Sequence, residues 1–355
     1  MKIVYVCERS YNLYRTLLKA VNSSDEIDLV ITDNVKGMEL MYDELRNSGL
    51  FNNVYYFNDL THKTFVHPLK EEATFSIKRF SDIFSVLKSF FLIIIAFFEY
   101  LKSQKKAKYI TLPEGLNFDK YDEIYITDCT SILNFYLYHK EYKNLIYVEH
   151  AKDALRGKYP AITNILGVFV KLRLIYGIRG SCRHIKAIEV NENRGLVSET
   201  KNKKIREVPL SSLLTDVTFE QGEFIYQIYA KSYGLNFPRN STVDMFLTTP
   251  IRAETRERVH VHVCKEVIRE YMSDSEYIII KPHPFDKTDY SEILEIYPNV
   301  VITPSCFSAE VFALSSSLRI RKLINIDSSA VDAFNSVDEV VTVGYEFVEK
   351  CRETL

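Results

Sequence analysis

The sequence predicts an α/β protein made of two doubly wound domains in series. In the first 150 residues, short apolar runs rich in β-branched residues alternate with helical stretches. The same alternation resumes at residue 243 and continues to residue 343, whereas residues 151–240 are less regular. Strands that alternate with helices are typical of βαβ units around a parallel sheet. We therefore expect residues 1–235 to form an N-terminal Rossmann-like domain and residues 236–355 to form a C-terminal one.

The N-terminal half contains short apolar runs that predict strands and longer helical patterns between them. The expected strands are Ile3–Cys7, Ile27–Thr32, Val54–Phe57, Glu123–Thr127 and Leu145–Val148. The expected helices are Leu13–Val21, Gly37–Ser48, a long one near Ile77–Lys105, and Ser131–His139. In the middle of the chain we expect a helix at Ile162–Ile175, a strand at Ala187–Val190, a loop at Asn191–Arg206, a helix at Gln221–Ser232 and a turn-rich linker at Gly234–Asn240.

The C-terminal half repeats the pattern of strands and helices. The expected strands are Val243–Thr248, Tyr277–Lys281, Val300–Thr303, Lys322–Asp327 and Val340–Val343. The expected helices are Glu254–Met272, Tyr290–Tyr297 and Ala309–Ser316. Ligands of open α/β sheets bind at the carboxyl ends of the strands. The residues that directly follow these strands are therefore the first candidates for a binding site, in a cleft that the two domains would face.

Composition and charge narrow the classes of partner and the compartment. Lys and Arg number 45 against 47 Asp and Glu, a net charge of −2, so no overall field attracts the chain to nucleic acid. The six cysteines are scattered without CxxC pairs, which fits a reducing compartment. The start at Met1 runs straight into a strand pattern, without the layout of a signal peptide. We expect a cytoplasmic protein.

One apolar run, Phe90–Phe98, raises the question of a membrane. The uncharged stretch from Ser89 to Phe98 is far shorter than the ~20 residues that span a bilayer. We expect a buried helix of the N-terminal domain. The alternative is an interfacial helix whose basic flank contacts lipid headgroups at the cytoplasmic face of the inner membrane. That flank contains Lys102, Lys105, Lys106 and Lys108.

A second basic cluster lies in the less regular middle of the chain. It consists of Lys171, Arg173, Arg179, Arg183, His184 and Lys186. A solvated face is the simpler interpretation. The alternative is contact with an anionic acceptor or with anionic lipid headgroups.

The segment Lys281-Pro282-His283-Pro284 follows the apolar strand Tyr277–Lys281. The two prolines fix the backbone on both sides of His283. A rigid imidazole at the carboxyl end of a strand can donate a hydrogen bond or a proton to the phosphate of a leaving nucleotide. The alternative is a structural turn. We predict that this segment, including Lys281 and Pro284, lies at a donor-nucleotide site.

The next strand-to-helix junction is rich in hydroxyl groups between Thr303 and Glu310. Ser308 directly precedes the expected helix and is therefore an N-cap candidate. Ser305 and Ser308, together with backbone N–H groups, can also bind a phosphate. The two roles are compatible.

Two acidic residues follow strands of the first domain and are candidates for a general base. Glu149 follows Leu145–Val148, and Asp128 follows Glu123–Thr127. Burial and a nearby phosphate raise the pKa of such a carboxylate toward the range useful for proton abstraction. His260 and His262 alternate as metal ligands on a strand do, but on the expected helix their side chains diverge. No metal site is predicted.

These motifs, in this order, resemble those of bacterial sialyltransferases and polysialyltransferases, which build capsule or lipooligosaccharide. The opening Val4–Leu13 resembles their first strand, polar turn and helix, and Asp28–Asp33 with Gly49–Val54 is similar to their second unit. Glu149 lies where these enzymes carry an acidic motif. Lys281–Pro284 resembles their His-Pro motif, and Thr303–Ser308 resembles their later Ser/Thr motif. The resemblance touches most of the chain.

The resemblance implies a GT-B, inverting, metal-independent glycosyltransferase without a cofactor, which uses CMP-sialic acid as donor and a hydroxyl of a surface glycan or glycolipid as acceptor. It implies that Glu149 is the general base and that His283 is the acid or hydrogen-bond donor to the CMP phosphate. Ser305 and Ser308 would bind that phosphate. Thr248, Thr249 and Pro250 would lie near the donor.

The acidic motif departs from the family pattern of two acids and a glycine, because here it is Glu149-His150-Ala151. This departure leaves two alternatives open. One is a GT-B enzyme that uses another nucleotide sugar, such as CMP-Kdo or a UDP- or GDP-sugar. The other is a non-catalytic glycan-binding protein of the same fold.

Overall fold

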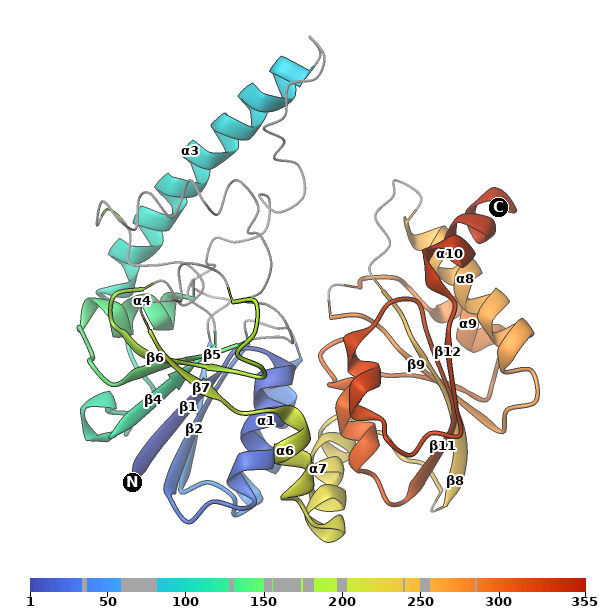
Figure 1. Ribbon diagram of the computed structural model, residues 1–355, viewed down its shortest axis with the longest axis horizontal. Helices are drawn as coiled ribbons and strands as arrows, with labels where there is room; N and C mark the ends of the chain where they lie inside the picture. The colour runs from blue at the N-terminus through green and yellow to red at the C-terminus, as the bar shows by residue number, and fades with distance from the viewer. Residues whose placement is uncertain are drawn as a thin grey trace. The chain divides into compact units, whose positions relative to one another are not determined.

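The protein is described by a computed structural model that covers residues 1–33, 37–58, 82–127, 131–149, 155, 174, 182–196, 203–238, 240–249, 256–284 and 286–355. The chain divides into two compact units (Figure 1). The first contains residues 1–16, 23–42 and 49–213, and the second contains residues 17–22, 43–48 and 214–355. Each unit is built around its own parallel sheet.

The first unit holds a sheet of seven strands in the order β3-β2-β1-β4-β5-β6-β7. In chain order the strands are β1 (Lys2–Cys7), β2 (Glu26–Thr32), β3 (Asn53–Phe57), β4 (Glu123–Ile126), β5 (Leu145–Val148), β6 (Ile185–Val190) and β7 (Lys204–Glu207). All neighbouring pairs are parallel. The strand order runs outward from β1 in one direction through β3 and in the other through β7. The switch point of the sheet therefore lies between β1 and β4, where doubly wound folds bind ligands.

Helices connect these strands and cover the sheet. They are α1 (Ser10–Ala20), the 3₁₀ helix η1 (Met38–Met41), α2 (Tyr42–Asn47), α3 (Asp82–Ala107), the 3₁₀ helix η3 (Phe118–Lys120) and α4 (Ile132–His139). Val4, Val6 and Ile126 of the central strands are fully buried together with Tyr100 of α3 and Phe135 of α4. The rings of Tyr100 and Phe135 lie 4.7 Å apart between centroids, which joins α3 to α4.

The second unit holds a sheet of five parallel strands in the order β10-β9-β8-β11-β12. The strands are β8 (Ser241–Leu247), β9 (Tyr277–Lys281), β10 (Val300–Ile302), β11 (Leu318–Asn325) and β12 (Glu339–Thr342). This is again a doubly wound order that runs outward from its first strand. The two sheets confirm the predicted pair of Rossmann-like α/β domains, the GT-B fold class.

The remaining helices follow β7 along the chain. They are α6 (Leu210–Thr215), α7 (Phe219–Ser232), α8 (Arg256–Tyr271), α9 (Ser291–Ile296), α10 (Gly344–Glu353) and the 3₁₀ helices η5 (Ala309–Leu314) and η6 (Ser329–Ala333). α7 precedes residue 235, where the sequence predicted a domain boundary, but its aromatic rings pack in the second unit. Tyr229 contacts Phe307 with centroids 5.3 Å apart, and Tyr226 contacts Phe312 at 6.1 Å.

The structure agrees with most expected elements, and β5 and β9 have the predicted bounds. The loop predicted at Asn191–Arg206 is wrong at its end, because β7 begins at Lys204. This edge strand has a polar sequence, so it lacks the apolar alternation that predicts a strand. The helix predicted at Ala309–Ser316 is a shorter 3₁₀ helix. Apart from Leu174, the helix predicted at Ile162–Ile175 lies outside the described residues, so this prediction is not tested.

The apolar run at Phe90–Phe98 lies in a helix, as predicted, but the expected burial is wrong. Phe91 and Phe98 of α3 are 63% and 62% exposed. The N-terminal end of the helix extends away from the first sheet (Figure 1). Among the described residues, no helix combines the length and the apolar character that crossing a bilayer requires.

Candidate functional site

The second sheet brings three predicted segments to one edge. Because β10, β9 and β8 are neighbours and parallel, the residues that follow them lie side by side. Thr248 follows β8, His283 follows β9 and Ser305 follows β10. Backbone hydrogen bonds continue the pairing beyond the strands, from Thr248 N to Lys281 O at 3.1 Å and from Thr303 N to Ile280 O at 3.0 Å. The His-Pro turn is therefore the middle one of three adjacent loops.

The backbone of His283 is held on both sides. Its N–H donates to Oγ1 of Thr248 over 3.0 Å, and its carbonyl oxygen accepts from the N–H of Asp286 over 2.8 Å. Pro282 is buried, whereas the His283 side chain is half-buried and Pro284 is exposed. The turn thus fixes the position of His283 through its main chain and leaves the ring at the surface of the sheet edge.

Asp286 anchors this turn through a buried network that the sequence did not predict. Its Oδ2 accepts from Tyr290 Oη at 2.6 Å and from Thr248 Oγ1 at 3.3 Å, and lies 3.2 Å from Nδ1 of His260. Its Oδ1 accepts from the N–H and the hydroxyl of Thr288 at 2.9 and 2.6 Å. Burial raises the pKa of Asp286, but the hydrogen bonds from His260, Thr288 and Tyr290 outweigh it and lower the pKa below its usual value.

His260 connects the network to the loop after β8. Its Nε2 donates to the carbonyl oxygen of Thr249 over 2.7 Å, and its side chain is only 2% exposed. His262, two residues later on α8, points elsewhere and contacts the hydroxyl of Thr354 at 3.1 Å. The two histidines diverge, as a helix requires. Within the described part of the chain, no group of three or more His, Cys, Asp or Glu side chains is arranged to hold a metal ion.

Lys281 lies beneath the turn rather than on its surface. It is 5% exposed, and its ammonium group donates to the carbonyl oxygens of Pro282 and, over 3.2 Å, of Ser305. Burial lowers the pKa of Lys281 to about 8. The ammonium group therefore ties the loop after β9 to the loop after β10 and places a positive charge behind both.

The predicted hydroxyl residues have partners of their own. Ser308 is the residue before η5, but its hydroxyl donates to Oε2 of Glu310 over 2.6 Å and caps no backbone N–H, so the predicted capping role is wrong. The hydroxyl is oriented toward this carboxylate, a charged acceptor, and its oxygen accepts from no N–H of the first turn. Ser305 is half-buried. Thr249 is buried, and its hydroxyl lies 3.4 Å from that of Tyr345. Pro250 lies outside the described residues.

In the first unit, Glu149 directly follows β5 and is 3% exposed. Its Oε1 accepts from the backbone N–H of Leu155 at 3.2 Å, and its Oε2 accepts from that of Asn191 at 3.1 Å. Its carbonyl oxygen accepts from the amide of Asn12 at 3.1 Å. The carboxylate thus holds two chain segments beside the end of β5. Asp128, the alternative base, lies outside the described residues.

A further buried carboxylate lies at the switch point of the first sheet. Glu8 follows β1 and has no exposed surface, and its Oε2 accepts from the side-chain amide of Asn134 over 2.9 Å. Its backbone N–H contacts the hydroxyl of Thr127, which follows β4, at 3.4 Å. Sequence reasoning placed this residue in a polar turn and did not consider it for the site. An acid directly after the first strand of a doubly wound sheet was the available signal.

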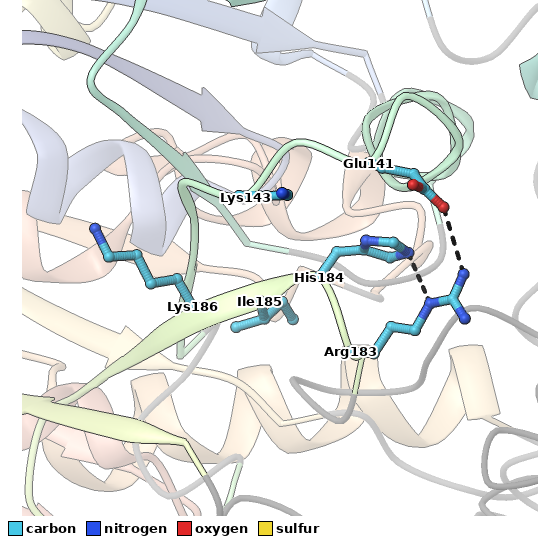
Figure 2. Close-up of a pocket in the computed structure, with 6 residues that line it drawn as sticks. All are labelled: Glu141, Lys143, Arg183, His184, Ile185 and Lys186. Atoms are coloured by element: carbon cyan, nitrogen blue, oxygen red, sulfur yellow. Dashed lines mark hydrogen bonds and ion pairs between the residues drawn. The ribbon is translucent and has the colours of Figure 1, made fainter.

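A basic hollow of about 530 Å³ lies at the opposite end of the first sheet (Figure 2). Its lining residues are Glu141, Lys143, Arg183, His184, Ile185 and Lys186. Nε of Arg183 donates to Nε2 of His184 over 3.0 Å, and burial with the charge of Arg183 lowers the pKa of His184. Two of the lining residues directly precede β5 and the other four lie just before or at the start of β6, whereas Glu149 follows β5. The hollow is therefore separate from the carboxyl edge of the sheet.

Solved structures with a similar chain path include two bacterial sialyltransferases and a sugar-nucleotide epimerase. The α/β-galactoside α-2,3-sialyltransferase of Photobacterium phosphoreum is 11% identical over 96% of this chain and 90% of its own, with a TM-score of 0.41. A sialyltransferase of Photobacterium damsela is 12% identical over 96% and 74%, with a TM-score of 0.40. The UDP-GlcNAc 2-epimerase of Methanocaldococcus jannaschii is 12% identical over 100% and 92%, with a TM-score of 0.47. No curated protein sequence matches the chain.

The family model of glycosyltransferase family 52 matches residues 97–331, about two thirds of the chain. The match includes Glu149, the His283 turn with its network, and Ser305 and Ser308. It confirms the resemblance to bacterial GT-B sialyltransferases on which the sequence prediction rested. It also confirms the prediction that the protein is a glycosyltransferase. The chain belongs to glycosyltransferase family 52.

Proposed function

We propose that the protein transfers sialic acid from CMP-sialic acid to a hydroxyl group of a bacterial surface glycan, with inversion and without a metal ion. The observation that carries this proposal is the His283 turn. It lies at the carboxyl edge of a doubly wound sheet, its main chain is anchored by Thr248 and Asp286, and its ring is half-buried. An enzyme that releases a nucleotide phosphate needs a preorganised hydrogen-bond donor where negative charge develops on the leaving group.

The chemistry places the largest demand on the leaving group. When the bond between C2 of sialic acid and the CMP phosphate oxygen breaks, its electron pair stays on the phosphate. His283 donates a hydrogen bond or a proton to that oxygen, and a preorganised donor of this kind contributes on the order of 10²–10³ in rate. With the leaving group stabilised in this way, no metal ion and no cofactor are needed.

The neighbouring loops supply the rest of the proposed donor site. Ser305 and Ser308 bind the phosphate, and Thr248, Thr249 and Pro284 lie beside the donor. The buried ammonium group of Lys281 supplies a positive charge behind the two loops that hold the phosphate. Its contact with the Ser305 carbonyl also fixes the geometry of the phosphate loop.

The acceptor hydroxyl must lose its proton as it attacks the sugar. We propose Glu149 as the general base, with Asp128 as the alternative. Glu149 lies at the carboxyl edge of the first sheet, and the N–H groups of Leu155 and Asn191 hold its carboxylate in place. The acceptor belongs to a capsule, a lipooligosaccharide or an O-antigen. The reaction takes place in the cytoplasm, with peripheral contact to the inner membrane.

The donor is tested by thermal unfolding in the presence of CMP, UDP and GDP. A ligand at 100 times its Kd stabilises the folded state by about 2.7 kcal/mol, so the preferred nucleotide is identified by the largest increase in Tm. We expect CMP to give the largest increase and CMP-sialic acid to be turned over with a galactoside or sialoside acceptor. A larger shift with UDP or GDP would indicate another nucleotide sugar. CMP binding without turnover by any acceptor would favour a non-catalytic glycan-binding protein.

A further inference from the structure

The outward face of α3 is apolar where the surface helix of a soluble protein is normally polar. Four large apolar side chains lie on it at spacings of three and four residues: Phe91, Ile94, Ile95 and Phe98, which are 63%, 40%, 43% and 62% exposed. Residues at these spacings share one face of a helix. A surface helix normally directs such a stripe toward the core and exposes its polar side chains.

The opposite face of the same helix already packs against the core. Tyr100, Ser103 and Ala107 are 1%, 5% and 0% exposed, and Phe97 and Leu101 pack against the same core cluster. The exposed apolar stripe is therefore not the face through which α3 packs on the core. It is a second apolar face, and exposed apolar patches of this kind mark contact sites.

The same face becomes basic toward the C-terminal end of the helix. Lys102, Lys105 and Lys106 continue the spacing of three and four residues from Phe98, and all three are exposed. Lys108 follows directly after the helix, and the described part of this stretch contains one acidic residue, Glu99. An apolar stripe that continues into lysines is complementary to a bilayer with anionic headgroups, since the apolar side chains enter the acyl boundary and the ammonium groups reach the phosphates.

The position of this face relates it to the candidate site. α3 runs opposite to the strands, so its first half extends beyond the edge at which the strands of the first sheet end (Figure 1). Glu8 and Glu149 follow strands at that same edge. The apolar part of the face, which begins at Phe91, thus lies nearer to this edge, where Glu149 follows β5, than the lysines at the other end of the helix do.

We propose that the outward face of α3, from Phe91 to Lys106, lies on the surface of an anionic lipid bilayer. This inference rests on the peripheral membrane contact in the proposed function and names the surface and the lipid class. The helix lies in the interface and does not cross it. Phe91 and Phe98 enter the acyl boundary, and Lys105 and Lys106 contact phosphate headgroups.

The test is flotation of the purified full chain with two kinds of vesicle, phosphatidylcholine alone and phosphatidylcholine mixed with phosphatidylglycerol. We expect binding to the mixed vesicles and weak binding to the neutral ones. Phe91→Ser/Phe98→Ser should reduce binding to the mixed vesicles at least about tenfold, because two apolar side chains no longer enter the bilayer. Lys105→Ser/Lys106→Ser should reduce it about 30-fold on mixed vesicles and leave binding to neutral ones unchanged.

Two matched variants in the second unit serve as controls. Lys231→Ser/Lys350→Ser removes the same charge, and Phe219→Ser/Leu294→Ser removes two exposed apolar side chains. Both should bind mixed vesicles like the unchanged protein. If the controls lose binding as the α3 variants do, or if the unchanged protein does not bind mixed vesicles, the proposal is wrong.

The alternative occupant of the face is a second copy of the chain. Sedimentation velocity without lipid distinguishes the two occupants. The lipid contact would be overturned if the unchanged protein is a dimer, if Phe91→Ser/Phe98→Ser converts it to a monomer, and if the protein does not bind vesicles. The outcome is independent of the donor chemistry. Vesicle binding without turnover of CMP-sialic acid would refute the proposed function and leave the lipid contact in place. Turnover of a soluble acceptor without vesicle binding would refute the lipid contact and leave the proposed function in place.

Discussion

The carboxyl edges of the two sheets hold their candidate catalytic residues in opposite ways. After β9, the main chain of His283 is anchored at both its N–H and its carbonyl oxygen, and the ring is half-buried. After β5, the side chain of Glu149 is itself the anchor, since both carboxylate oxygens accept backbone N–H groups and the residue is 3% exposed. A residue held by its main chain can present its side chain to a ligand. A residue whose side chain itself holds the fold cannot be substituted without also removing contacts that stabilise the protein.

This difference predicts which substitutions separate stability from activity. Changes at the His283 ring should affect the reaction alone, whereas changes at Asp286 should affect the fold and changes at Glu149 should affect both. The expected effects, from the largest to the smallest, follow from the contacts of each residue.

Asp286→Ala should lower the free energy of unfolding by about 3–5 kcal/mol, because it leaves buried His260, Thr288 and Tyr290 without their common acceptor. Denaturant unfolding measures this. Lys287→Ala, one residue further and exposed, is the matched control and should stay within about 0.5 kcal/mol. A change of less than 1 kcal/mol at Asp286 would show that the network does not support the turn.

His283→Ala should lower the rate of transfer on the order of 10²–10³, about 2.7–4 kcal/mol of transition-state stabilisation, with CMP affinity and Tm nearly unchanged. The turn is held through main-chain hydrogen bonds of His283 that this substitution keeps, so we expect Tm to change little. Transfer kinetics, calorimetry with CMP and thermal unfolding measure the three quantities. His262→Ala, on the far side of α8, should retain activity. Full activity of His283→Ala would remove it from the reaction.

Much of this arrangement was predictable from sequence because it depends on local patterns. The apolar run Tyr277–Lys281 followed by Pro282-His283-Pro284 predicts both the strand and the turn, and the bounds of β9 agree. The network behind the turn was not predictable in this way. His260 and Asp286 are far apart in the sequence, and only the packing of α8 on the sheet brings them within 3.2 Å. A histidine on the core-facing side of a helix was the one local signal, and its spacing with His262 drew attention to metal binding instead.

Glu149→Gln should lower the free energy of unfolding by about 1–3 kcal/mol, because the new amide NH₂ group faces a backbone N–H that needs an acceptor. If Glu149 is also the base, transfer should fall far more than this loss of stability explains at a temperature where the variant is folded. Asp128→Asn is the comparison, measured in the same transfer assay. Loss of transfer in Asp128→Asn, with activity kept in Glu149→Gln, would move the base to Asp128 and leave Glu149 a structural role.

Lys281 should make stability depend on pH in the alkaline range. Its pKa in the folded protein is about 8, below the ordinary 10.5, so between these values the unfolded chain binds more protons. Stability should therefore rise with pH across this window by up to about 1.4 kcal/mol per pH unit from this group. Denaturant unfolding at several pH values, compared with Lys281→Met, measures the contribution. The same slope in both proteins would contradict the buried position of the ammonium group.

The central claim is that His283 meets the phosphate of the donor nucleotide, and a crystal structure of the protein with CMP tests it most directly. We expect the CMP phosphate at the edge formed by β8, β9 and β10, with one oxygen within about 3 Å of the His283 ring and others near the hydroxyl groups of Ser305 and Ser308. A nucleotide bound at the first sheet, or a phosphate at the second sheet without contact to the His283 ring, would contradict the assignment.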